Sequence, residues 1–129
     1  FIAERDKIIS KKKNIYLKEK NSLNLINSKE KYDLIWVDGS HGYPTVCVDI
    51  INSLKLINNN GLILCDDVFT NKPKNQDGTY SSIATFETIT ALKKEKLINF
   101  HLIYKRLEAQ NNCDPNKRKF IAVLNKNFS

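Results

Sequence analysis

The chain has 129 residues, of which 41% are hydrophobic and 27% are charged. This composition predicts one soluble globular domain over residues 1–129 and excludes collagen-like, solenoid and disordered chains. No stretch approaches the roughly 18 apolar residues of a membrane span, and the first residues do not form a signal peptide. We therefore expect a cytoplasmic protein that does not act at a membrane. Because the chain contains no Met and begins at Phe1, we expect it to be a piece of a longer protein.

The net charge of +7 is distributed unevenly along the chain. Residues 1–31 hold nine Lys and Arg against four Asp and Glu, residues 32–92 hold three against seven, and residues 93–129 hold nine against three. Most of the basic residues are Lys dispersed among Asn and Ile, whereas nucleic-acid binding usually shows clustered Arg with interleaved aromatic residues. We therefore expect no nucleic-acid partner, and we look for chemistry in the acidic middle of the chain.

The three cysteines are Cys47, Cys65 and Cys113. They are odd in number, far apart and without the paired spacing of a metal site, and two lie in apolar runs. This pattern predicts free, buried thiols.

The first part of the chain predicts three short elements. Apolar residues among charges indicate a surface helix from Ile2 to Lys13. Three consecutive apolar residues within 14–19 indicate a short strand. Ser22 is a candidate cap for a short helix from Leu23 to Asn27.

The middle predicts two strands with a helix between them. Tyr32–Val37 is an apolar run, typical of a strand with helices over both sheet faces. Pro44 suits the first position of the helix, which residues 58–61 are expected to end. Leu62–Cys65 is the second strand. The helix should bury one stripe, formed by Cys47, Ile50, Ile51 and Leu54.

The last part predicts a loop, a helix and a hairpin. Residues 69–80 are polar and suit a surface loop that covers a site. Ser82–Lys96 has helical spacing, and Ile98–Tyr104 and Lys119–Leu124 form the simplest antiparallel pair. The strand–helix alternation before them requires parallel strands, so we predict an α/β sheet with an antiparallel end.

Acidic residues end both central strands. Asp38 follows the first, and Asp66 with Asp67 ends the second. Neighbouring parallel strands would bring the three carboxylates together at the edge where such sheets bind ligands. Because their charges repel, a cation should lie among them, and oxygen ligands favour Mg²⁺, Ca²⁺ or Mn²⁺. The alternative is that these residues only form turns and helix caps.

A histidine lies at the same edge. His41 is three residues beyond Asp38, where an imidazole can accept a proton near neutral pH. The alternative is a packed or solvated side chain. His101 alternates within a predicted strand and is interpreted as structural.

Two motifs carry a resemblance to a known family. Residues 32–41, YDLIWVDGSH, with Tyr43 and Asp49, and residues 61–67, GLILCDD, resemble the second half of a class I S-adenosylmethionine-dependent methyltransferase. The pattern is most similar to small-molecule O-methyltransferases of the catechol and macrocin types. It covers roughly residues 14–124 and implies a Rossmann-like, mostly parallel sheet with helices on both faces and a C-terminal antiparallel hairpin. The family's first strand and Gly-rich loop are absent, so the chain corresponds to the C-terminal part, strands three to seven.

The resemblance also implies roles for individual residues. Asp38, Asp66 and Asp67 fall at the positions that bind Mg²⁺, and Asp38 also borders the cofactor and the reacting groups. His41 stands where catechol-type enzymes have a catalytic Lys. The turn that contacts the adenine matches Asn21 and Ser22. We interpret Tyr43 as helix packing and Asp49 as part of a solvated helix face.

These residues predict a function for the complete protein. We expect methyl transfer from S-adenosylmethionine to a hydroxyl of a small molecule, a sugar included, assisted by Mg²⁺ or a similar divalent cation. One alternative is a metal-dependent phosphoryl hydrolase or transferase, which also uses clustered carboxylates. Another is a non-catalytic remnant.

Overall fold

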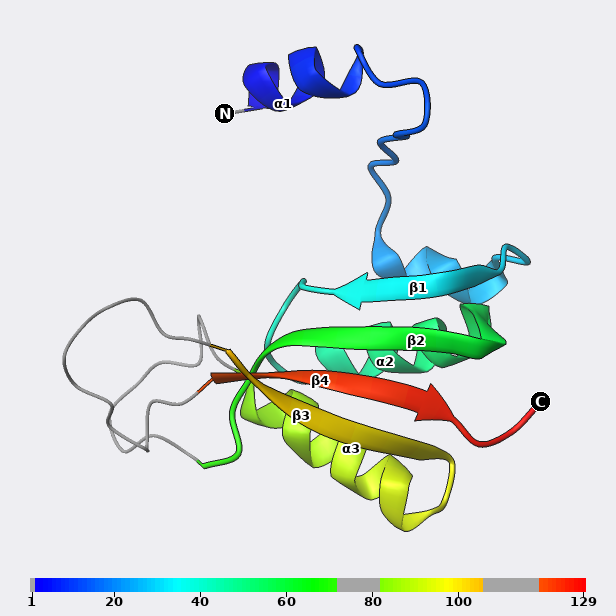
Figure 1. Cartoon of the computed structure of the whole chain (residues 1–129), viewed down its shortest axis with the longest axis vertical. Coiled ribbons are helices and arrows are strands. Elements are labelled where there is room, and N and C mark those ends of the chain that lie inside the picture. Colours follow the sequence, from blue (N-terminus) through cyan, green and yellow to red (C-terminus); the bar gives the residue numbers. More distant parts are fainter. Residues whose placement is uncertain (1, 72–81, 106–118) are drawn as a thin grey trace, which may run out of the picture.

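The computed structural model describes residues 2–71, 82–105 and 119–129 and shows a mixed α/β fold around an open sheet (Figure 1). The elements in chain order are α1 (Ile2–Ile9), the 3₁₀ helix η1 (Ser22–Asn27), β1 (Tyr32–Val37), α2 (Thr45–Leu56), β2 (Ile57–Val68), α3 (Ile83–Lys94), β3 (Ile98–Lys105) and β4 (Lys119–Lys126).

The sheet has the strand order β1-β2-β4-β3. β1 pairs in parallel with β2, and β4 is antiparallel to both β2 and β3. The predicted α/β class, the parallel central pair and the antiparallel final pair are confirmed. Because β4 lies between β2 and β3, the carboxyl ends of β1, β2 and β3 all meet at one edge of the sheet (Figure 1).

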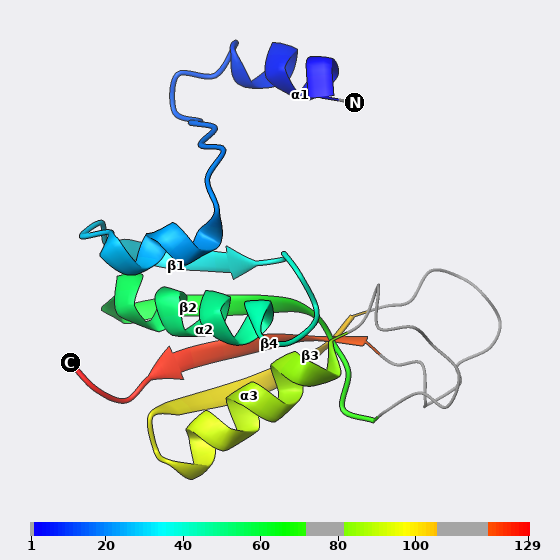
Figure 2. The same cartoon turned by 180° about the vertical axis from the view of Figure 1, so that it is seen from behind.

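The hydrophobic core lies between the sheet and the helices α2 and α3 (Figure 2). Ile50 of α2, Ile63 of β2, Ile89 of α3 and Leu124 of β4 are completely buried. Cys65 is buried in the same core and is a free thiol, and burial raises its pKa to about 12. The predicted buried free thiol is confirmed for Cys65. Cys47 is free and half-buried, and Cys113 lies outside the described residues.

The other face of the sheet differs from the expectation. Leu34 and Trp36 of β1 remain 58% and 50% exposed, because α2, α3 and η1 all lie on the opposite face (Figure 2). For the described residues, the prediction of helices on both faces is therefore wrong. In the described part of the chain, β1 is an edge strand with one face that no helix covers, and yet its sequence is a continuous apolar run.

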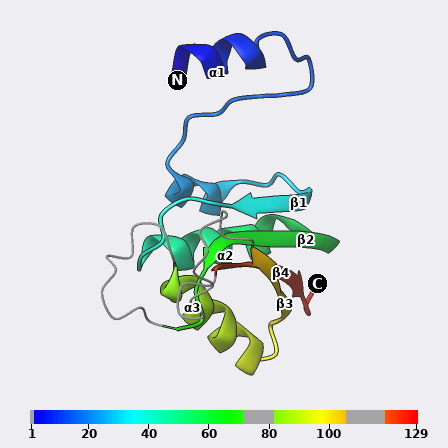
Figure 3. The ribbon, with the colours of Figure 1, turned by 60° about the vertical axis from the view of Figure 1, so that its left-hand side comes forward.

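The chain before η1 also departs from the prediction. α1 ends at Ile9, four residues before Lys13, and buries no side chain. Residues 14–19 form no strand, and their apolar side chains are exposed. Figures 1 and 3 show this segment running away from the sheet, so no strand in the described part of the chain supplies the hydrogen bonds that it would need.

The helix ends are set by local hydrogen bonds. Asn21, rather than Ser22, caps η1, because its side chain accepts a hydrogen bond from the Leu23 N–H at 3.0 Å. α2 begins at Thr45, with Pro44 at its cap position. At α3, Ser82 is the N-cap and accepts from the Thr85 N–H at 2.9 Å. The predicted helix over Ser82–Lys96 is confirmed to within two residues at its end.

The junction of α2 and β2 lies earlier than predicted. α2 ends at Leu56, and residues 58–61 belong to β2. Gly61 is needed there for close packing, because a Cβ atom would lie 2.7 Å from Cγ1 of Ile57 and 2.8 Å from the Asp33 carbonyl oxygen.

None of the described helices has the length and apolar character needed to cross a membrane.

Two neighbouring residues of α2 provide a test of this core. Ile50 is fully buried, whereas Ile51, predicted to share its stripe, is 46% exposed. We expect Ile50→Ala to lower the free energy of unfolding by about 2–5 kcal/mol, because it leaves a cavity. Ile51→Ala should change it by less than about 1 kcal/mol. Urea unfolding followed by Trp36 fluorescence measures both, and equal losses would contradict the assigned helix face.

Candidate functional site

The candidate site lies where β1 and β2 end. Their parallel register pairs Val37 with Cys65, so Asp38 directly follows β1, and Asp66 and Asp67 lie in the last three residues of β2. Ligand atoms of Asp38, His41 and Asp67 lie within 4.8 Å of one another. Asp38 is exposed, while His41 and Asp67 are half-buried. The structure thus brings together three of the four residues predicted for this edge.

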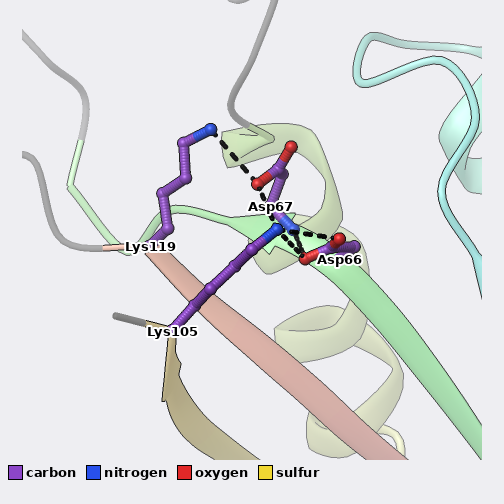
Figure 4. A network of polar contacts seen from close by, with 4 residues as sticks. All are labelled: Asp66, Asp67, Lys105 and Lys119. Carbon is purple, nitrogen blue, oxygen red and sulfur yellow. Dashed lines mark hydrogen bonds and ion pairs between the residues drawn. The ribbon is translucent and has the colours of Figure 1, made fainter. Parts of the chain in front are cut away.

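Asp66 does not join that group. Lys105 at the end of β3 donates to both of its carboxylate oxygens, at 2.7 and 2.9 Å (Figure 4). Lys105 also contacts Oδ1 of Asp67 at 3.0 Å, and Lys119 at the start of β4 contacts the same atom at 3.1 Å. In the described residues, two ammonium groups thus neutralise Asp66 and Asp67, and the assignment of Asp38, Asp66 and Asp67 to one cation stays a prediction.

A β-bulge in β2 includes Asp66 and Asp67. The register between β2 and β4 shifts between Cys65 and Val68, and Asp67 has a φ of 52°. Asp tolerates this left-handed conformation better than most residues, and the Asp67 N–H donates to Oδ1 of Asp66 at 2.7 Å. Bulges re-aim side chains beside functional sites. Here the bulge lets Asp67 reach both the lysines and the Asp38–His41 side.

The lysines control the ionisation of this edge. Burial alone would raise the pKa of Asp67, but hydrogen bonds from Lys105 and Lys119 outweigh it and hold that pKa below its usual value. Burial alone would lower the pKa of Lys105, but hydrogen bonds from Asp66 and Asp67 outweigh it and raise that pKa. Asp67 and Lys105 therefore both stay charged at neutral pH.

Ser82 ties together the two loops that carry the site. Its hydroxyl donates to the His41 carbonyl oxygen at 2.8 Å. Its N–H donates to the Asp67 carbonyl oxygen at 2.7 Å. Ser82 is fully buried. The cap of α3 thus fixes the main chain of both His41 and Asp67.

The His41 ring carries an unused polar atom. Its Nδ1 is buried and has no hydrogen-bond partner within the described residues. A buried nitrogen without a partner is costly in free energy. A hydroxyl of a bound molecule could supply the missing hydrogen bond. The two carboxylates of Asp38 and Asp67 beside it fit a divalent cation.

A cavity of about 340 Å³ adjoins Asp38 between η1, β1 and α2. Asp49 lines it, and its Oδ1 is buried without a partner among the described residues. The interpretation of Asp49 as part of a solvated helix face is therefore wrong. A cavity of this size with an unpaired buried acceptor fits a ligand that carries N–H or O–H donors, as a nucleoside cofactor does. The other lining residues are Leu25, Ile35, Trp36, Val37, Gly39 and Ser53.

Asn21 and Ser22 hold η1 in place beside this cavity. Asn21 caps the helix, and the Ser22 carbonyl oxygen accepts from Asn52 of α2 at 2.9 Å. Neither residue lines the cavity, and their assignment to the cofactor stays a prediction. Tyr43 lies next to α3, with its hydroxyl 3.4 Å from Oγ1 of Thr88. Most of the covering loop predicted over residues 69–80 lies outside the described residues.

Sequence reasoning missed Lys105, Lys119 and Ser82. The two lysines are register partners at the end of the predicted antiparallel pair. Extending that hairpin by one residue in the sequence would have placed them at the edge that holds Asp66 and Asp67. Ser82 gave only the signal of a helix cap, and its contacts with His41 and Asp67 depend on the tertiary fold.

Comparison with known proteins agrees with this geometry. Residues 4–68, which are 65 of the 129, match the sequence profile of a family described as a methyltransferase domain, and the chain belongs to that family. A search of curated proteins gives no match.

Two solved structures share the fold. One is described as an O-methyltransferase from Klebsiella pneumoniae, with a TM-score of 0.57 and 16% identity over 83% of this chain and 46% of that one. The other is described as an rRNA methylase from Clostridium thermocellum, with a TM-score of 0.57 and 14% identity over 97% of this chain and 69% of that one. The chain thus spans about half the length of the first structure and covers only part of its fold.

Two buried serines test the role of Ser82. We expect Ser82→Ala to lower the free energy of unfolding by about 1–2 kcal/mol, because the change removes a helix cap and leaves the His41 carbonyl without its donor. Ser53 is also buried, but its hydroxyl bonds only the Asp49 carbonyl one turn earlier in α2. Ser53→Ala should cost less than about 0.5 kcal/mol. Chemical unfolding compares the two variants, and an equal cost would contradict the bridging role.

Proposed function

We propose that the protein containing this chain transfers a methyl group from S-adenosylmethionine to a hydroxyl of a small molecule, with help from a divalent cation. Membership of the methyltransferase family supports the reaction class. The observation that carries the finer proposal is the grouping of Asp38, His41 and Asp67 within 4.8 Å. Carboxylates and an imidazole at the carboxyl edge of a parallel pair are suited to binding and deprotonating a hydroxyl.

Asp38 and Asp67 would hold the cation. When bound, such an ion orients the acceptor hydroxyl and lowers its pKa. Asp67 contributes a carboxylate that stays ionised, because its lysine partners keep its pKa low. Asp38 contributes an exposed carboxylate that faces arriving substrate.

His41 would take the proton that the hydroxyl loses as its oxygen bonds to the methyl carbon and the carbon–sulfur bond breaks. Its ring lies within reach of both carboxylates, and Ser82 holds its main chain. A fixed base at the reaction centre contributes through both proton transfer and alignment.

The cavity beside Asp38 would receive part of the cofactor. Leu25 and Ile35 offer apolar contact, and the unpaired Oδ1 of Asp49 can accept a hydrogen bond from a ligand N–H or O–H. Asp38 lines this cavity and also belongs to the cation group. It therefore adjoins both the cofactor and the acceptor.

Two rivals remain as outcomes of the assays. Family membership favours methyl transfer over a phosphoryl hydrolase, although the carboxylate group suits either chemistry. One structural neighbour is described as an rRNA methylase, so RNA is tested as an acceptor. The scattered lysines of this chain favour a small molecule.

Cation dependence tests the proposal directly. The protein is incubated with methyl-labelled S-adenosylmethionine and a panel of sugars, catechols and other small hydroxyl compounds, with rRNA in parallel. Product should fall to background in EDTA and return with Mg²⁺ or Mn²⁺, because the carboxylates then regain the ion. Cofactor binding, measured by calorimetry, should persist in EDTA. Full turnover in EDTA would remove the cation from the proposal, and methylation of rRNA alone would remove the small-molecule acceptor.

Replacing the base tests the role of His41. His41→Ala should reduce kcat by about 10²–10⁴-fold, since it removes a general base, while KM for the cofactor changes little. The matched control is His101→Ala, because His101 is exposed on β3, and it should retain activity within about twofold. An unchanged kcat for His41→Ala would show that another group accepts the proton.

A further inference from the structure

Among the described residues, the charged side chains around the candidate cation site nearly balance without an ion. Asp38, Asp66 and Asp67 carry −3, and Lys105 and Lys119 carry +2, which leaves −1. The lysines come from β3 and β4, whereas the carboxylates follow or end β1 and β2 (Figure 4). The hairpin thus places two fixed cations beside the position proposed for a divalent ion.

The contacts determine which carboxylate oxygens are available. Lys105 engages both oxygens of Asp66, so a cation that approaches Asp66 must share those oxygens with an ammonium group. Both lysine contacts with Asp67 go to Oδ1. Its second oxygen points away from the lysines (Figure 4).

We propose that Lys105 and Lys119 are positioning residues that set the cation affinity of this site by withholding Asp66 and by repelling the incoming ion. This inference rests on the cation-binding part of the proposed function. The lysines keep the affinity of the site for the cation low. Asp38 and Asp67 then bind the ion weakly, and Asp66 stays in its ion pair with Lys105.

Burial makes this electrostatic control strong. The side chains of Asp66 and Asp67 are only 10% and 16% exposed. Charges in such positions are screened less by solvent and salt than surface charges are. A fixed ammonium within a few ångströms of a divalent ion therefore has a large effect on binding.

A purely structural role would be a latch between β2 and the β3–β4 hairpin. Removing a latch would lower stability, and it would either weaken cation binding or leave it unchanged. Removing a competing charge would instead strengthen cation binding. The two roles therefore predict changes of opposite sign for Lys105→Met.

The experiment measures binding of Mn²⁺ to the purified chain by the electron paramagnetic resonance signal of the free ion. We expect Lys105→Met to bind Mn²⁺ at least about tenfold more tightly than the wild type, because one repelling charge is lost and Asp66 becomes a ligand. Asp66→Asn should then cost at least about tenfold more affinity in the Lys105→Met background than in the wild type. The control is Lys126→Met at the far end of β4, where Lys126 bonds the Ile57 carbonyl at 3.0 Å, and it should leave affinity unchanged.

Circular dichroism checks that each variant is folded. If Lys105→Met does not fold, Lys119→Met replaces it and should show a smaller gain, because it removes one of the two lysine contacts with Oδ1 of Asp67 and leaves Lys105 on Asp66. Equal Mn²⁺ affinity in the wild type and in the folded lysine variant would overturn this inference alone. Absence of binding in every variant would overturn both the inference and the cation in the proposed function.

Discussion

The parallel pairing of β1 with β2 is the constraint on which the rest of the structure depends. It sets Val37 opposite Cys65, and the residues that follow each strand then meet at one edge. A shift of one residue would turn every side chain of β1 to the opposite face. Ile35 and Val37 would leave the core, and Asp38 would no longer face the Asp67 side. Packing of the two strands and assembly of the site are therefore fixed by the same register.

Much of this arrangement could be predicted from the sequence. The apolar runs gave both central strands, and the acidic residues after them gave the edge at which the site lies. The segment over residues 14–19 could not be assigned in this way, because three apolar residues form a strand only beside a partner. Asp66 could not be placed either, since its partner Lys105 is 39 positions away in the chain and its direction depends on a bulge in β2.

The exposed face of β1 shows that an apolar run in the sequence does not by itself predict burial of both faces of a strand. A continuous apolar run is typical of a strand buried on both faces, yet Leu34 and Trp36 of β1 are exposed. The sequence records that these positions are apolar but not what lies over them. In the described residues β1 is also an edge strand, with main-chain groups on one side that no strand pairs.

The charges of the three carboxylates predicted that a positively charged partner lies beside them, but not which group supplies that charge. Three carboxylates at one edge require positive charge, and a divalent ion is the simplest source when only the strand ends are considered. The fold supplies positive charge from Lys105 and Lys119. Lys105 forms an ion pair with Asp66, and both lysines contact one oxygen, Oδ1, of Asp67. What remains is a smaller group of Asp38, His41 and Asp67, and its imidazole carries a buried nitrogen without a partner among the described residues. The lysines thus divide one acidic cluster into a structural half and a half that is available for chemistry.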